Sequence, residues 1–135
     1  MDAIIFSWSG SFREDFDDRE GRIRDFMGEM QERGSEIGLV TDGKIEEVEE
    51  MLPTDFIIPQ VQDLQEVLSS LDTKYDKTFF VSDVKAELVT ANQSGAFTIG
   101  FSSGETDAEE LGGVGPNYLV ESLEELEKIL RLETL

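Results

Sequence analysis

The side chains that could do chemistry in this sequence are hydroxyls and carboxylates that directly follow short apolar runs. The sequence contains no His and no Cys, so it lacks the usual general base and the thiolate metal ligand. Catalysis would have to use carboxylates, hydroxyls or lysine amines. The candidates are Ser7, Ser9, Gly10 and Ser11; Thr41, Asp42 and Gly43; Pro59; Ser82, Asp83 and Glu87; and Ser102, Ser103 and Gly104.

Two kinds of chemistry are open to these groups. An unassisted serine hydroxyl is a poor nucleophile near neutral pH, and no base is evident beside Ser7. Asp83 and Glu87, four residues apart, offer the oxygen ligands that Mg²⁺ prefers. Acids at the start of a helix also stabilise the helix dipole. The pair therefore has two interpretations, a weak metal site or a helix start. The serines and Thr41 also have a purely structural interpretation, as turn and strand-end residues.

Apolar runs that alternate with helical periodicity must position these residues. Strands are expected at residues 3–6, 37–40, 56–58, 78–81, 97–101 and 118–120. Helices are expected where apolar residues recur at helical spacing, at 23–30, 45–52, 61–71 and 84–93, and after Ser122, where Glu125 completes a capping box. Because the strands are continuously apolar, we expect burial on both faces and a parallel sheet.

The predicted fold class is α/β: one Rossmann-like domain over residues 1–135, three layers deep, with a parallel sheet of about five to six strands and helices on both faces. In such sheets ligands bind beyond the carboxyl ends of the strands. The hydroxyls and carboxylates above all fall at that edge.

The order of these residues resembles the haloacid dehalogenase superfamily, whose commonest members are magnesium-dependent phosphatases. "IIFSWSGSF" is similar to the first motif, D-x-D-G-T-[LV], and "GLVTDGK" to the second, a strand that ends in Thr or Ser. "IIP" is similar to the third, which normally ends in Lys-Pro, and "FFVSDVKAELVTANQSGAFTIGF" to the fourth, G-D-x-x-x-D. "YLVESLEELEKIL" resembles the last strand and helix, and the short first connection resembles a form without a large cap.

The resemblance implies roles that this chain fills only in part. The nucleophilic Asp and the acid/base Asp of the first motif correspond to Ser7 and Ser9, and the Lys of the third motif corresponds to Ile58. Gly10, Thr41 and Asp42 remain as candidates for holding a phosphoryl group. Asp83 and Glu87 match the metal-binding acids of the fourth motif, with Ser82 where Gly is usual.

Two classes of function follow. The first is a catalytically inactive relative of a phosphatase that acts as a binding or regulatory protein for a small phosphorylated ligand or a protein partner. The second is a Mg²⁺-dependent phosphatase of small phosphorylated substrates with an altered active site. A receiver domain of two-component signalling is rejected, because it needs an acidic pair, an Asp and a Lys where Ser7, Pro59 and Ser102 stand.

Acidic residues dominate the charge, with 31 Asp and Glu against 11 Lys and Arg and a formal net charge of -20. They recur beside apolar residues in the helical segments, for example Glu121, Glu124, Glu125 and Glu127, which indicates solvated faces. Binding to nucleic acid or to an anionic membrane is not expected, because no window gathers a basic patch. Without a leader or an apolar stretch near 18 residues, a cytoplasmic location is expected.

This composition resembles that of cytoplasmic proteins of salt-accumulating halophiles, and it predicts a salt requirement. At 1 M salt the Debye length is about 3 Å, against about 10 Å at 0.1 M, so repulsion among the carboxylates is screened. We expect the domain to loosen or unfold as salt is removed, in a titration followed by circular dichroism. A spectrum unchanged down to millimolar salt contradicts the halophilic interpretation.

Overall fold

The structure is a computed structural model and describes residues 1–7, 22–41, 53–58, 64–102 and 108–134. Its strands are β1 (Ala3–Ser7), β2 (Glu36–Val40), β3 (Phe56–Ile58), β4 (Thr78–Ser82), β5 (Phe97–Phe101) and β6 (Tyr118–Val120). Its helices are α2 (Arg22–Glu32), α4 (Leu64–Asp72), α5 (Lys85–Gln93), α6 (Ala108–Gly112) and α7 (Leu123–Glu133).

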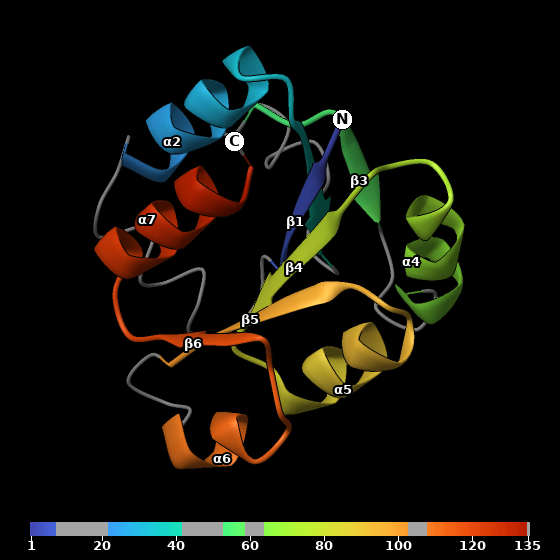
Figure 1. Cartoon of the computed structure of the whole chain (residues 1–135), viewed down its shortest axis with the longest axis vertical. Coiled ribbons are helices and arrows are strands. Elements are labelled where there is room, and N and C mark those ends of the chain that lie inside the picture. The colour runs from blue at the N-terminus through green and yellow to red at the C-terminus, as the bar shows by residue number, and fades with distance from the viewer. Residues whose placement is uncertain (8–21, 42–52, 59–63, 103–107, 135) are drawn as a thin grey trace.

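The six strands form one sheet in the order β3-β2-β1-β4-β5-β6, and every neighbouring pair is parallel (Figure 1). The chain starts in the middle with β1, moves outward to β3, and returns across β1 to build the other half. The order reverses between β1 and β4, which is where open parallel sheets bind ligands. The predicted parallel α/β fold is confirmed.

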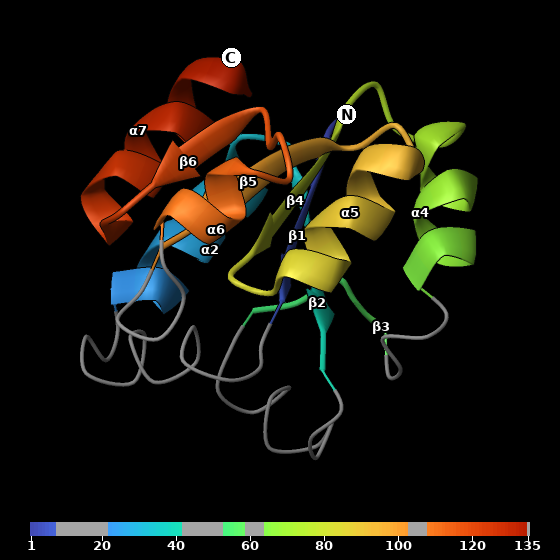
Figure 2. The same cartoon turned by 90° about the horizontal axis from the view of Figure 1, so that it is seen from below.

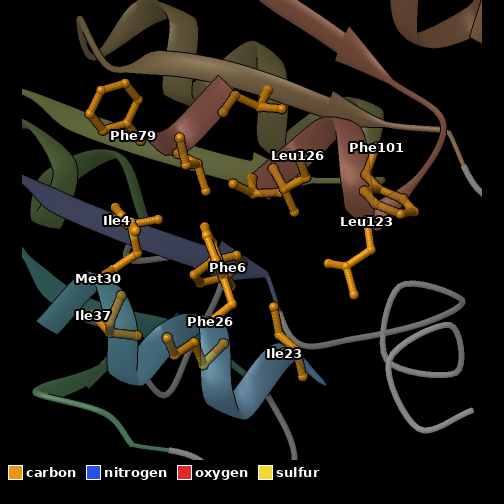
Figure 3. Packing of buried hydrophobic residues seen from close by; sticks show 14 of the residues in the cluster. Ile4, Phe6, Ile23, Phe26, Met30, Ile37, Phe79, Phe101, Leu123 and Leu126 are labelled. Carbon is orange, nitrogen blue, oxygen red and sulfur yellow. The ribbon is translucent and has the colours of Figure 1, made fainter. Parts of the chain in front are cut away.

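Two apolar clusters, one on each face of the sheet, hold the helices. Helices α2 and α7 cover one face, and α4 and α5 cover the other (Figure 2). Along β1, Ile4 and Phe6 face the first cluster and Ile5 faces the second, as the strand period of two requires. Figure 3 shows Phe6 between Phe26 of α2 and the apolar side chains of α7.

The ends of two helices follow the sequence signals. Gly34 follows α2 with a φ of 99°, a left-handed conformation that favours glycine. The Ser122 hydroxyl accepts a 3.2 Å hydrogen bond from the Glu125 backbone N–H at the start of α7. The Glu125 carboxylate accepts from the Glu121 N–H, so it reaches one residue before the cap.

The described elements differ from the predicted ones in a few places. Helix α6 was not predicted; it is only five residues long and places Leu111 in the second cluster. Helix α4 is described from Leu64 onward, so the first residues of the predicted helix at 61–71 lie outside the described residues, as does the predicted helix at 45–52. None of the helices in the described ranges is both long and apolar enough to span a bilayer.

One acidic side chain contradicts the prediction of solvated faces. Glu127 on α7 is only 6% exposed, because it lies between α7 and α2. Its carboxylate pairs with the Arg22 guanidinium at 2.8 Å. Nearby, Arg131 makes a two-pronged contact with Glu29 at 2.8 and 3.0 Å, and this contact lowers the pKa of Glu29. The prediction was wrong here because the helical repeat places Glu127 toward α2 rather than toward water.

A close contact at Gly38 predicts a stability change. A Cβ added at Gly38 would lie 2.3 Å from the ring of Phe56, its partner on β3. Gly38→Ala must therefore displace that ring from the second cluster, and we expect a loss of about 1 to 3 kcal/mol in the free energy of unfolding. Denaturant unfolding in constant molar KCl measures it.

Gly28→Ala is the matched control, because nothing lies within 4 Å of a Cβ at that position in α2. Alanine there should gain about 0.5 to 1 kcal/mol, since glycine is costly inside a helix. Equal stability of the two alanine variants would show that the packing of Phe56 does not require glycine at residue 38.

Candidate functional site

The carboxyl ends of β1, β2 and β4 form the candidate site. Ser7 ends β1 and pairs with Val40 of β2, so Thr41 follows directly beside it. On the other side, Phe6 pairs with Val81 of β4, so Ser82 is the next residue along that strand. Neighbouring strands lie about 4.8 Å apart. The hydroxyls of Ser7, Thr41 and Ser82 thus belong to one edge of the sheet, and all three residues are buried.

Strand alternation decides which way Ser82 points. On β4, Phe79 and Val81 lie in the cluster under α2 and α7, and Phe80 lies in the cluster under α4 and α5. Ser82, two residues after Phe80, therefore faces α5. Its hydroxyl donates a 2.9 Å hydrogen bond to Oε1 of Glu87, and it accepts one of 2.9 Å from the Val84 backbone N–H.

Helix α5 brings Glu87 into this edge. Its N-cap, Val84, has extended backbone and no side chain that can cap the helix. Glu87 lies in the first turn, where a negative charge is stabilised by the helix dipole. It is only 4% exposed, and Leu88 and Ala91 are buried on the same helix. Burial of this side of α5 against the sheet therefore also buries the carboxylate.

The carboxylates do not complete a divalent metal site among the described residues. Asp83 and Glu87 are both buried and could each supply oxygen ligands. Mg²⁺ prefers six oxygen ligands in octahedral geometry, with carboxylates to offset its charge. No group of three or more acidic side chains able to hold a metal ion occurs within the described ranges. One oxygen of Glu87 is also already bonded to the Ser82 hydroxyl.

The structure locates some of the predicted site residues. Ser7 and Thr41 lie at neighbouring strand ends, and Asp83 and Glu87 lie at the end of β4 and in the first turn of α5. Ser9, Gly10 and Asp42 lie outside the described residues. The bond from Ser82 to Glu87 was missed, because the spacing of the two residues does not show that Ser82 turns toward α5.

Ile58, which the motif resemblance matches to the lysine of the third motif, is part of the core. Its side chain is buried at the end of β3 in the cluster that contains Val40, Leu64 and Leu68. A lysine here would place its ammonium group among apolar side chains, which is costly unless the charge is paired. The hydrocarbon at Ile58 thus serves packing.

No protein-family model and no curated protein matches this chain. Solved structures do. A predicted phosphatase from Clostridium acetobutylicum has a TM-score of 0.66 at 20% identity over 83% of this chain. A haloacid dehalogenase-like family hydrolase from Streptococcus pneumoniae has a TM-score of 0.62 at 15% identity over 82% of it. The chain spans 59% of the length of each.

A third structure matches over the whole length. It is a conserved haloacid dehalogenase-like protein of unknown function from Agrobacterium tumefaciens, with a TM-score of 0.62 at 10% identity and 100% coverage of both chains. At these identities the likeness concerns the fold. The chain therefore has the haloacid dehalogenase-like fold, and the fold expected from the motif resemblance is confirmed.

Proposed function

We propose that this chain is a haloacid dehalogenase-like domain that does not hydrolyse phosphate esters and acts as a binding or regulatory protein. The observation that carries the proposal is Ser7. It is a buried residue at the carboxyl end of the central strand β1, where the motif resemblance implies a nucleophilic carboxylate. A serine hydroxyl there needs a base to act as a nucleophile, and the chain has no histidine.

The remaining substitutions add to this deficit. A positioned carboxylate that transfers a proton contributes about 10²- to 10⁴-fold, or about 3 to 5 kcal/mol of the barrier, and Ser9 occupies the position that would hold it. The amine implied by the third motif is replaced by the core residue Ile58. The site retains the hydroxyls of Ser7 and Thr41. These groups can form hydrogen bonds to oxygen atoms but carry no charge.

The ligand that suits this proposal is a small phosphorylated molecule or a protein partner. Hydroxyls and backbone amides at the ends of parallel strands are suited to phosphoryl oxygens, and the edge where the strand order reverses is the usual place for a ligand. A cytoplasmic location is part of the proposal, as are the exclusions of nucleic acid and membrane as partners, which rest on the net charge of -20.

The alternative is a Mg²⁺-dependent phosphatase with altered chemistry. It is favoured by the buried carboxylates of Asp83, which follows β4, and of Glu87, in the first turn of α5, where the motif resemblance implies metal ligands. In that case these two side chains would hold Mg²⁺, which would offset charge on a phosphoryl group. The likeness to the predicted phosphatase from Clostridium acetobutylicum supports the same alternative.

Hydrolysis of p-nitrophenyl phosphate with Mg²⁺ in molar KCl separates the two. We expect no turnover by the native chain above the rate without protein, because neither a carboxylate nucleophile nor its acid/base partner is present. A paired variant, Ser7→Asp with Ser9→Asp, should gain activity if the fold descends from phosphatases. Ile58 is left unchanged, since a lysine there would disturb the core.

The control is Asp83→Asn, which removes one charge at the buried end of β4. Turnover by the native chain that scales with protein and is lost in Asp83→Asn would refute the proposal and establish the phosphatase. A change in melting temperature on adding phosphate esters, without turnover, would support binding of a phosphorylated ligand.

A further inference from the structure

A buried hydrogen bond links the end of β4 to the first turn of α5. We propose that the Ser82 hydroxyl takes the place of a cation at the Glu87 carboxylate, so that this buried carboxylate is satisfied without a divalent metal. The proposal concerns the same site as the proposed function, but it does not depend on whether the chain turns over a substrate.

The geometry of the bond supports this role. Ser82 is fully buried, and its hydroxyl lies 2.9 Å from Oε1 of Glu87. The hydroxyl is the donor in this bond, because an ionised carboxylate can only accept. The same hydroxyl oxygen accepts from the Val84 N–H at 2.9 Å. With the oxygen engaged as an acceptor, its single hydrogen is available for the carboxylate.

The energetics explain why Glu87 needs such a partner. A carboxylate that is 4% exposed has lost most of its contact with water, and burial of a charge is costly without compensation. A hydrogen bond to a charged acceptor is about twice as strong as a neutral one. Removing the Ser82 hydroxyl would leave the Glu87 carboxylate with one hydrogen bond fewer. A cation bound at the carboxylate would then compensate for the lost bond and stabilise the variant more than the native chain.

The hydroxyl donor at residue 82 distinguishes this sequence from the motif that it resembles. The motif that the end of β4 resembles usually has glycine at the position of Ser82, and glycine has no hydroxyl to offer. In this proposal a cation binds through Oε1 of Glu87 and must displace the Ser82 hydroxyl, so the free energy of that hydrogen bond opposes metal binding. Ser82 is therefore expected to weaken metal binding.

Metal binding is measured by calorimetric titration of MgCl₂ into the purified chain in 2 M KCl, and stability by thermal unfolding with and without 10 mM MgCl₂. For the native chain we expect weak binding and almost no change in melting temperature. Ser82→Ala should melt about 3 to 8 °C lower without Mg²⁺. It should recover part of that loss with Mg²⁺ and bind Mg²⁺ at least about tenfold more tightly than the native chain.

Two controls assign the effect to the carboxylate. Ser94→Ala removes a hydroxyl that donates to the Thr90 carbonyl just past the other end of α5, with no carboxylate involved. Its melting temperature should not respond to Mg²⁺. Adding Glu87→Gln to Ser82→Ala removes the charge, and the gain in Mg²⁺ affinity should disappear with it.

Two results would overturn the proposal. One is a Ser82→Ala variant that binds Mg²⁺ no more tightly than the native chain. The other needs no change at Ser82: tight Mg²⁺ binding by the native chain that Glu87→Gln weakens tenfold or more would make Glu87 a ligand despite its bond. Neither readout uses p-nitrophenyl phosphate, so the proposal can fail while the proposed lack of turnover stands, and the reverse.

Discussion

Burial of β1 on both faces is the constraint on which the rest of the structure depends. Its five residues are fully buried, and the strand pairs in parallel with β2 on one side and β4 on the other. Because parallel strands need crossover connections, this pairing forces helices onto both faces. It also brings the carboxyl ends of the central strands to one edge. The position of Ser7 and Ser82 in a shared site is thus a consequence of how the core is built.

That edge must satisfy its polar groups inside the protein. Buried hydroxyls and carboxylates are tolerated when they have hydrogen-bond partners, and Ser82 and Glu87 supply each other with one. Where a charged nucleophile and a cation would balance each other in an enzyme, this chain has neutral hydroxyls and an internally bonded carboxylate. In the inactive domain that we propose, the serines that stand in place of reactive acids therefore also reduce the need for a metal. The proposed loss of catalysis and the proposed metal-free site share one physical reason.

The strands could be predicted from the sequence because each contains a short apolar run, which the sheet buries completely in β1 and β4 and only in part in the edge strands β3 and β6. Sequence reasoning missed α6, whose five residues are too short to show a helical period and are held by the burial of Leu111. At the site, the sequence indicated Asp83 and Glu87 but did not show which of the two is bonded to Ser82. Only the alternation along β4, which turns Ser82 toward α5, shows which of the two acids is bonded to it. Spacing alone carries no such information.

The arrangement of the few cations completes the electrostatic account. The four arginines of the described ranges, Arg22, Arg24, Arg33 and Arg131, all lie in α2 or α7 or next to them, whereas carboxylates extend over the other helices. Exposed ion pairs contribute little each, about 0 to 1 kcal/mol, and salt weakens them. The pair of Arg22 with buried Glu127 is screened less. High salt therefore screens much of the repulsion across the acidic surface, but it weakens the ion pair between α2 and α7 only slightly. The distribution of arginine is consistent with a domain in which α2 and α7 stay in contact in concentrated salt.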